Sequence, residues 1–169
     1  MRIALDSSVL IAAHISRAGV CAELLEDVLL HHDLVISDFI LAELGRKLIE
    51  KFNFPRRDAE LVSAFLRRVS VVVKPADLPP DLCRDPTDVP VLGTAVAGEC
   101  AILISVDRDL LDMKKFQAIP IIRPGEYWRA RICDRNPRRD GSLTGISVRL
   151  CAYPCFMCFR CIEGHEVCD

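Results

Sequence analysis

The chain has 169 residues, of which 51% are hydrophobic and 27% charged, and its formal net charge is −2. This composition excludes an intrinsically disordered chain, and the charge excludes nucleic-acid binding through an overall positive field; such a ligand would need local basic patches or a bridging metal ion. No apolar run reaches the 18 or more residues of a membrane-spanning helix, and the first residues do not resemble a secretory signal. We therefore expect a cytoplasmic protein with no membrane association and with reduced cysteines.

Short apolar runs alternate with segments of helical periodicity through the first three quarters of the chain. Strands are expected over residues 3–5, 34–36, 69–73, 101–106 and 119–122. Helices are expected over 9–31 with a turn at 17–19, from 39 onward, over 56–68, 91–98 and 110–114, and from 124, with a proline-rich loop over 78–83. This alternation predicts right-handed βαβ crossovers, and hence an α/β fold of three layers, α/β/α, with a mostly parallel central sheet.

Acidic residues recur where the predicted strands end or the next helices begin. These residues are Asp6, Glu43, Asp88, Asp107 and Asp109. In a doubly wound sheet such positions converge on the carboxyl edge of the strands. Several carboxylates in one crevice raise one another's pKa values unless a cation neutralises them. Hard oxygen ligands suit Mg²⁺ or Mn²⁺, and no His-x-x-His pattern accompanies the acids, which argues against a zinc hydrolase.

A divalent ion held by carboxylates can lower the pKa of a bound water and stabilise charge on a phosphoryl oxygen. The residues by themselves therefore indicate metal-dependent phosphoryl chemistry. The competing interpretation is that the acids only cap helices, because an acid at a helix start is common. At the first helix we expect Ser7 or Ser8 to be the cap, with the helix beginning near Val9, and we expect Asp38 to help cap the helix that carries Glu43.

Five short motifs together resemble the PIN domain family of metal-dependent ribonucleases, in particular the bacterial and archaeal branch of toxins from toxin–antitoxin pairs. The motifs are Leu5-Asp6-Ser7-Ser8-Val9-Leu10, Ser37-x5-Glu43-Leu44, Asp85-Pro86-x-Asp88-x5-Thr94-Ala95, Ser105-Val106-Asp107-Arg108-Asp109-Leu110-Leu111 and Ile119-Pro120-Ile121-Ile122-x-Pro124-x-Glu126-Tyr127. Each motif alone is weak evidence. Together they cover residues 1–128 in the order and spacing of the family, so we expect a PIN-like nuclease domain over this range.

The resemblance implies a role for each acid. Asp6, Glu43 and Asp88 match the three main acids of the family, Asp107 matches the fourth, and Asp109 is a nearby auxiliary. They would hold one or two Mg²⁺ or Mn²⁺ ions and activate a water molecule that cuts RNA, as in an endoribonuclease. Ser7 and Ser8 stand where the family commonly has Thr and Asn, and Val89 stands where close relatives often have a polar residue. We expect these departures to retune the site.

The resemblance also implies partners, namely an RNA substrate, a cognate antitoxin protein and a second protomer in a homodimer. Apolar residues around Leu24–Leu30 and Phe52–Phe54 exceed what a small domain must bury. In this family such surfaces bind an antitoxin peptide or a second protomer, and the sequence equally fits ordinary core residues. Arg108 lies between two of the acids and is the basic residue we expect to contact RNA. The pairs Arg46-Lys47 and Arg56-Arg57 fit either phosphate contacts or solvated helix faces.

The chain changes character near Trp128. Residues 1–128 carry 15 basic and 19 acidic side chains, a net charge of −4, whereas residues 129–169 carry 7 and 5, a net charge of +2, together with six of the nine cysteines. We predict a basic linker and an irregular cysteine-rich tail over 129–169. The run Cys151-x3-Cys155-x2-Cys158-x2-Cys161-x6-Cys168 fits Zn²⁺ or an iron–sulfur cluster, and it equally fits an appended, unselected extension that is disordered without a metal.

Two other functions remain open at this point. A non-catalytic module that binds RNA or protein through a degenerate site is supported by Ser7, Ser8 and Val89. A phosphatase of the haloacid-dehalogenase type also places an aspartate after its first strand, but that chemistry needs a second acid two residues later, and Ser8 stands there.

Overall fold

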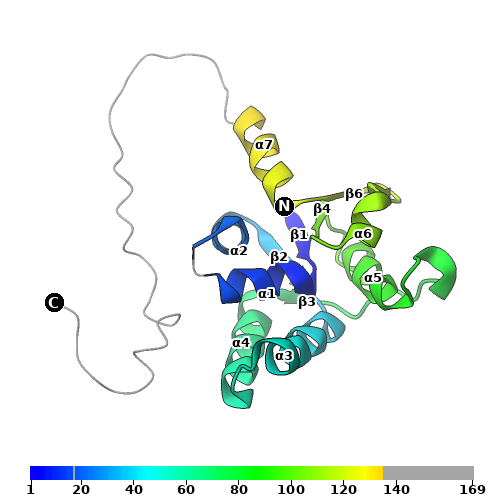
Figure 1. Cartoon of the computed structure of the whole chain (residues 1–169). Coiled ribbons are helices and arrows are strands. Elements are labelled where there is room, and N and C mark those ends of the chain that lie inside the picture. Colours follow the sequence, from blue (N-terminus) through cyan, green and yellow to red (C-terminus); the bar gives the residue numbers. More distant parts are fainter. Residues whose placement is uncertain (17, 135–169) are drawn as a thin grey trace, which may run out of the picture. The chain divides into compact units, whose positions relative to one another are not determined.

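The computed structural model describes residues 1–16 and 18–134, and its centre is a six-stranded sheet in the order β3-β2-β1-β4-β6-β5 (Figure 1). Five strands are parallel: β1 (Arg2–Leu5), β2 (Asp33–Ile36), β3 (Val71–Val72), β4 (Ile102–Ile104) and β6 (Ile119–Ile122). The sixth strand, β5 (Lys115–Phe116), runs antiparallel to β6. The mostly parallel sheet that the sequence predicts is confirmed.

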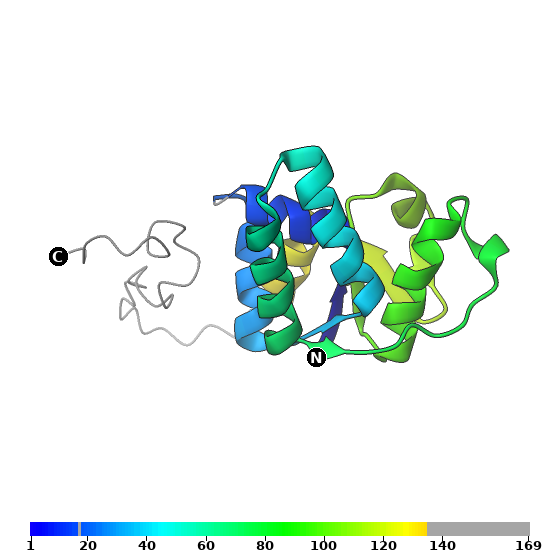
Figure 2. The ribbon, with the colours of Figure 1, turned by 90° about the horizontal axis from the view of Figure 1, so that it is seen from below.

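Helices cover both faces of the sheet. They are α1 (Ser7–Ile15), α2 (Val20–His31), α3 (Asp38–Phe52), α4 (Arg56–Val69), α5 (Val89–Ala97), α6 (Arg108–Asp112) and α7 (Pro124–Asp134), with 3₁₀ turns η1 (Pro80–Leu82) and η2 (Pro86–Asp88). Helix α5 packs on β1, β2 and β4, whereas α2 packs on β2 from the other face and is itself covered by α7. Figure 2 shows the strands between these two groups of helices, which is the predicted α/β/α layering.

The core lies between the sheet and its helices, and the central strands supply much of it. Ile3, Leu5, Val35 and Ile104 are all fully buried. Parallel strands that are covered on both faces read as continuous apolar runs, because neither face meets solvent. This is why short apolar runs locate β1, β2 and β4 in the sequence, although the run predicted over 101–106 is longer than β4 itself.

The order of the strands places a topological switch point beside β1. In the sheet, β2 and β3 lie on one side of β1. The chain then crosses back, so that β4 lies on the opposite side of β1. At such a reversal the segments that follow neighbouring strands diverge and leave a crevice at the carboxyl ends. Asp6 follows β1, and Ser105 follows β4. Both residues therefore lie at the position where α/β proteins bind their ligands.

The observed elements differ from the predicted ones at the edges of the sheet. The strand predicted over 69–73 is reduced to Val71–Val72, because β3 is an edge strand that pairs with β2 at these two positions only. The sequence analysis missed β5, whose flanking residues Lys114 and Gln117 have φ values of 59° and 53°. Non-glycine residues seldom adopt this left-handed region, so no turn could be recognised there.

Several helical segments also differ from the prediction. Helix α1 begins at Ser7 instead of Val9, and α5 begins at Val89 instead of Val91. The 3₁₀ turn η1 lies inside the segment predicted as a proline-rich loop, and α6 begins at Arg108 instead of Leu110. Helix α7 runs past Trp128 to Asp134, into the segment predicted as a linker. The predicted cysteine-rich tail lies outside the described residues.

Among the described helices, none is long and apolar enough to span a membrane by itself. Helices α1 and α2 meet the length and composition criteria only when taken together, and the chain bends by 109° between them.

Candidate active site

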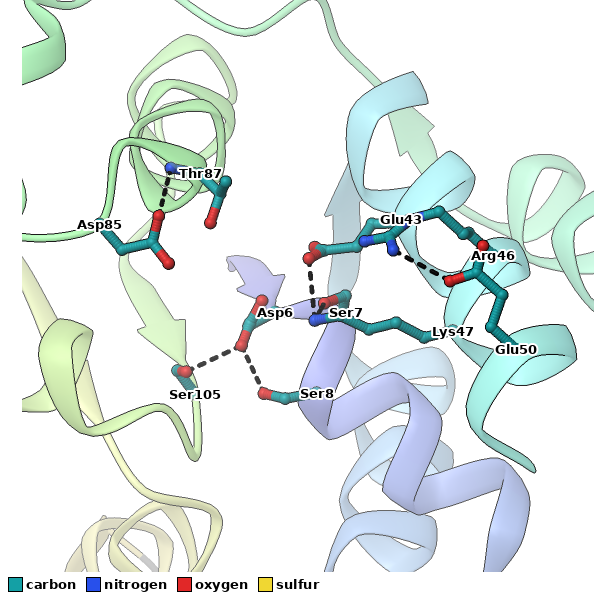
Figure 3. A network of polar contacts seen from close by, with 10 residues as sticks. All are labelled: Asp6, Ser7, Ser8, Glu43, Arg46, Lys47, Glu50, Asp85, Thr87 and Ser105. Carbon is teal, nitrogen blue, oxygen red and sulfur yellow. Dashed lines mark hydrogen bonds and ion pairs between the residues drawn. The ribbon is translucent and has the colours of Figure 1, made fainter.

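Asp6 lies at the carboxyl end of β1, and two serine hydroxyls hold its side chain. Only 5% of the residue is exposed. Ser8 and Ser105 both donate hydrogen bonds to Oδ2 of Asp6, the latter at 2.9 Å (Figure 3). The Ser105 hydroxyl in turn accepts the backbone N–H of Asp107 at 2.9 Å. Within the described part of the chain Oδ1 of Asp6 accepts no hydrogen bond, so its lone pairs remain available to a ligand.

The capping roles predicted for Ser7, Ser8 and Asp38 are wrong. Helix α1 begins at Ser7, and Asp6 occupies the N-cap position without a side-chain cap. Ser8 instead fixes the Asp6 carboxylate. At α3 the cap is Ser37, whose hydroxyl accepts the Ile40 N–H at 3.4 Å, while Asp38 forms an ion pair with Arg67 across to α4. Ser8 therefore orients the Asp6 carboxylate, and Asp38 connects α3 with α4.

Glu43 projects from α3 and carries its own counterion. The Lys47 ammonium lies 2.8 Å from Oε1 of Glu43, and it donates a longer hydrogen bond of 3.5 Å to the Ser7 hydroxyl. Figure 3 shows this lysine between Glu43 and the first residue of α1, beside Asp6. Helix α3 is held in place at its start by the Thr94 hydroxyl of α5, which hydrogen-bonds the Ser37 hydroxyl at 2.8 Å.

Asp88 ends η2 and lies in a strongly negative field. Burial, and then the charges of Asp107, Asp6, Asp85 and Asp109 in that order, raise the pKa of Asp88 from 3.8 to about 7. These carboxylates come from β1, the segment after β4, and the turn before α5, so the fold brings them close enough to repel one another. Asp85 itself caps η2 by accepting the Thr87 N–H at 2.9 Å.

Asp107 and Asp109 begin α6 on the other border of the crevice. The Asp107 carboxylate caps this helix by accepting the Asp109 N–H at 2.8 Å. Asp109 faces Arg84 of the loop before η2, with 3.7 Å between the charged atoms. Arg108, which we expected to contact RNA, is exposed to solvent.

The structure thus sorts the five predicted acids into two groups. Asp6, Asp88 and Asp107 share one negative field, and no ion pair to them is found within residues 1–16 and 18–134. Glu43 and Asp109 lie at the borders, each opposite a basic side chain, Lys47 or Arg84.

A divalent cation fits this site by charge and by donor type. The oxygens of the three central carboxylates are the hard ligands that Mg²⁺ and Mn²⁺ prefer. Burial and then the negative charges of neighbouring aspartates raise the pKa of Asp88, and a cation would relieve the repulsion between these charges. The carboxylates are not closed around one point, since the described residues contain no group of three or more His, Cys, Asp or Glu side chains at metal-binding spacing. Side-chain rotation would be needed to complete such a group.

Arg46 and Arg56, one from each basic pair of the sequence, form exposed ion pairs along their helices. Arg46 pairs with Glu50 at 3.1 Å, and Arg56 pairs with Glu60 at 3.6 Å. Arg46, Ile49, Glu50 and Arg56 also line an open hollow of about 450 Å³. These arginines are therefore engaged along their own helices.

The sequence analysis did not predict the contacts that Ser105 and Lys47 make with the acids of the site. Ser105 was part of a quoted motif, and its link to Asp6 spans 99 positions of the chain. Lys47 was considered only as a possible phosphate contact, although its spacing of four residues from Glu43 on one helix is a recognisable signal for an ion pair.

The sequence profile of the PIN domain family matches residues 2–109. No protein of curated function matches the chain significantly. Among solved structures, the chain is similar to VapBC2 from Rickettsia felis bound to a DNA fragment from their promoter, with a TM-score of 0.53, 11% identity, and coverage of 73% of this chain and 98% of the other.

Two further solved structures share the fold. The chain is similar to PAE2754 from Pyrobaculum aerophilum, with a TM-score of 0.53, 17% identity, and coverage of 80% of this chain and 91% of the other. It is also similar to VapBC-1 from nontypeable Haemophilus influenzae, with a TM-score of 0.51, 16% identity, and coverage of 74% and 99%. These identities are low, and the similarity therefore concerns the fold. Because the family profile covers more than half of the sequence, and the fold agrees with it, the chain belongs to the PIN domain family.

Proposed function

We propose that the protein is a metal-dependent endoribonuclease and the toxin component of a toxin–antitoxin pair. The main support is the convergence of Asp6, Asp88 and Asp107 at one edge of the sheet, where burial and then the neighbouring negative charges raise the pKa of Asp88 to about 7. Clustered carboxylates with perturbed pKa values at the carboxyl edge of a sheet are typical of functional sites. Membership of a family whose domains are generally nucleases supports the same reaction class.

The residues that would hold Mg²⁺ or Mn²⁺ are Asp6, Asp88 and Asp107, with Glu43 and Asp109 at the borders of the site. A cation bound there supplies a more acidic water and positive charge for the phosphoryl oxygens. The reaction is a hydrolysis: the water oxygen forms a bond to phosphorus, one P–O ester bond breaks, and a proton passes to the oxygen that leaves.

The chain's own residues orient these groups. Ser8 and Ser105 fix Oδ2 of Asp6, so that the side chain presents Oδ1 to a ligand. Ser105 also holds the backbone at Asp107, which couples the two strands that border the crevice. Arg108 is exposed at the start of α6, beside two of the acids, where its guanidinium can bind an RNA phosphate.

The proposed partners follow from the family and from the similar structures. The similarity to VapBC2 of Rickettsia felis and VapBC-1 of Haemophilus influenzae supports a cognate antitoxin. Exposed apolar side chains on the helices, among them Leu30 and Phe52, support an antitoxin peptide or a second protomer as the covering group. We further propose that the protein acts in the cytoplasm, as a homodimer.

Incubation of the purified protein with total RNA and Mg²⁺ or Mn²⁺, followed by mapping of the new RNA ends, tests this function. The wild type is expected to produce new ends that disappear when EDTA is added. The Asp6→Asn variant keeps the shape of the side chain and its contacts with Ser8 and Ser105, and it is expected to fold but not to cut. Cleavage that survives both EDTA and this substitution would overturn the proposal.

One observation favours a second candidate, a PIN-like module that binds RNA or protein without cutting. The described residues contain no ready-formed group of three metal ligands. Calorimetric titration with Mn²⁺ separates the two functions, because the module predicts no binding that depends on Asp6. RNA binding without cleavage, together with that result, would favour the module.

A further inference from the structure

We propose that the Lys47 ammonium is a built-in cation that occupies Glu43, so that this PIN domain holds a single divalent ion, at Asp6, Asp88 and Asp107. The inference rests on the proposed function and gives it a metal stoichiometry. The family resemblance leaves open whether one or two ions bind. Here we infer one, with Glu43 paired to Lys47 and not to a metal ion.

The geometry around Lys47 is that of a cation site with oxygen ligands. Its ammonium lies 2.8 Å from Oε1 of Glu43 and 3.5 Å from the Ser7 hydroxyl. The two contacts come from different helices, α3 and α1, and Ser7 is the direct neighbour of Asp6 in the chain. Figure 3 shows the ammonium between these oxygens, on the side of the network where Asp6 lies. A second metal ion at Glu43 would have to take this place.

The pair is more than a helix surface contact. Glu43 and Lys47 are four residues apart on α3, with the acid nearer the N-terminus, which is the more favourable order. Arg46 and Glu50 have the same spacing on this helix but the opposite order. The side chains of Lys47 and Glu43 are only 24% and 15% exposed, whereas both side chains of the Arg46–Glu50 pair are 57% exposed. Solvent screens an exposed pair but screens a partly buried pair far less. Lys47 therefore neutralises Glu43 more completely than its neighbour Arg46 neutralises Glu50.

Charge also separates Glu43 from the three central acids. Glu43 forms an ion pair with Lys47 at 2.8 Å, whereas no ion pair to Asp6, Asp88 or Asp107 is found among the described residues. One divalent ion at the aspartates and one fixed ammonium at Glu43 would together offset three of the four negative charges of these side chains.

Binding of a second metal ion to Glu43 would carry a free-energy cost. A second divalent ion would have to separate Lys47 from Glu43 and leave a partly buried ammonium without its partner, which is unfavourable. It would also place like charges close together. Removal of the ammonium by Lys47→Met keeps the length of the side chain and frees the Glu43 carboxylate for a metal ion.

Mn²⁺ binding to the full-length protein, measured by calorimetry and by electron paramagnetic resonance, tests the inference without any activity assay. The wild type is expected to bind about one Mn²⁺ per chain at the acids, and Lys47→Met about two, with magnetic coupling between neighbouring ions. Lys51→Met is the matched control, because Lys51 is an exposed lysine one turn further along α3. Asp6→Asn measures background binding elsewhere in the chain.

Glu43→Gln supplies an independent variant. It removes the carboxylate that Lys47 occupies, and it is expected to keep about one bound Mn²⁺, since the ion uses the aspartates. Two coupled ions in the wild type, a Lys47→Met stoichiometry equal to that of the wild type, or loss of the ion in Glu43→Gln would each overturn the inference. Absence of any Asp6-dependent Mn²⁺ binding would instead contradict the proposed function itself.

Discussion

Ser105 couples two of the acids of the proposed site, because its single hydroxyl donates to Asp6 and accepts from the backbone of Asp107. The side chain is fully buried. We predict that Ser105→Ala leaves the protein folded but weakens Mn²⁺ affinity or RNA cleavage by about 10- to 100-fold, the usual effect of losing a group that orients a metal ligand. Calorimetry and initial cleavage rates measure the change.

Ser63→Ala is the matched control for this variant. The Ser63 hydroxyl donates to the Ala59 carbonyl of its own helix at 3.0 Å, and it forms no hydrogen bond with the acids of the site in the described part of the chain. An effect on Mn²⁺ affinity as large as that of Ser105→Ala would show that general loss of stability, and not orientation of Asp6, explains the result.

The raised pKa of Asp88 predicts a pH dependence of stability in the metal-free protein. The folded state holds this proton up to about pH 7, whereas an unfolded aspartate loses it near pH 4. Between these values the folded state binds more protons than the unfolded state, so the free energy of unfolding falls as the pH rises. Asp88→Asn removes this contribution and should flatten that part of the profile.

Urea unfolding in EDTA at several pH values between 4 and 8 measures this effect. Asp112→Asn is the control, because Asp112 is exposed on α6 and should leave the profile unchanged. If the wild type and Asp88→Asn lost stability in parallel over this range, Asp88 would not be the group responsible for the pH dependence.

At the level of residues, the sequence predicted the acids but not their partners. Asp6 and Asp88 could be placed at one edge of the sheet because strand ends are recognisable from short apolar runs. The serine that orients Asp6 could not be found in this way, because Ser105 is distant in sequence and a serine after a strand carries no specific pattern. The cap of α1 was assigned wrongly, because Ser7, Ser8 and Asp6 are all good capping residues and only the geometry distinguishes them.

At the level of elements, α5 is fixed by a close backbone approach. A Cβ atom added at Gly93 would lie 2.6 Å from the Ala76 carbonyl oxygen, whereas one added at Gly45 on α3 would meet nothing closer than the Ser63 hydroxyl at 3.5 Å. We predict that Gly93→Ala destabilises the protein by about 1–3 kcal/mol through overpacking. Gly45→Ala should stabilise it by about 0.5–1 kcal/mol, since alanine favours a helix.

Chemical unfolding of both variants checks this pair of opposite effects. A Gly93→Ala variant as stable as the wild type would mean that α5 can move away from Ala76. In that case Asp88, which directly precedes α5, would not be held as rigidly as the structure indicates.

The elements of the interior were predictable, and those of the edges were not. The strands β1, β2 and β4 are apolar throughout because both faces are covered, which leaves a clear trace in the sequence. The short strand β5 is set by its pairing with β6 and by left-handed residues without glycine, so nothing local indicates it. Tertiary contacts therefore determine where these edge strands form.

At the level of the whole molecule, the last described helix predicts where the chain can be shortened. Tyr127 of α7 is 1% exposed and hydrogen-bonds Asp27 of α2. We predict that a chain ending at residue 134 unfolds at the same temperature as the full chain, whereas a chain ending at Arg123 is less stable by roughly 3–5 kcal/mol, the usual cost of deleting a large buried aromatic side chain. Differential scanning calorimetry compares the three chains.

A marked loss of stability on removal of residues 135–169 would contradict the predicted boundary between the domain and the tail. Zinc and iron analysis of the full chain and the shortened chain, both purified under reducing conditions, separates the two interpretations of the cysteine run. Metal found only in the full chain would support a thiolate site, and its absence would support an appended extension.

The central claim is that the crevice beside β1 uses its acids to cut RNA with a divalent ion. The most direct measurement is the initial rate of cleavage of a labelled RNA in Mn²⁺ by the wild type, Asp88→Asn and Asp112→Asn. We predict a fall of more than about 100-fold for Asp88→Asn, beyond the effect of losing an orienting group, and no change for Asp112→Asn. Equal rates for the wild type and Asp88→Asn would contradict the claim.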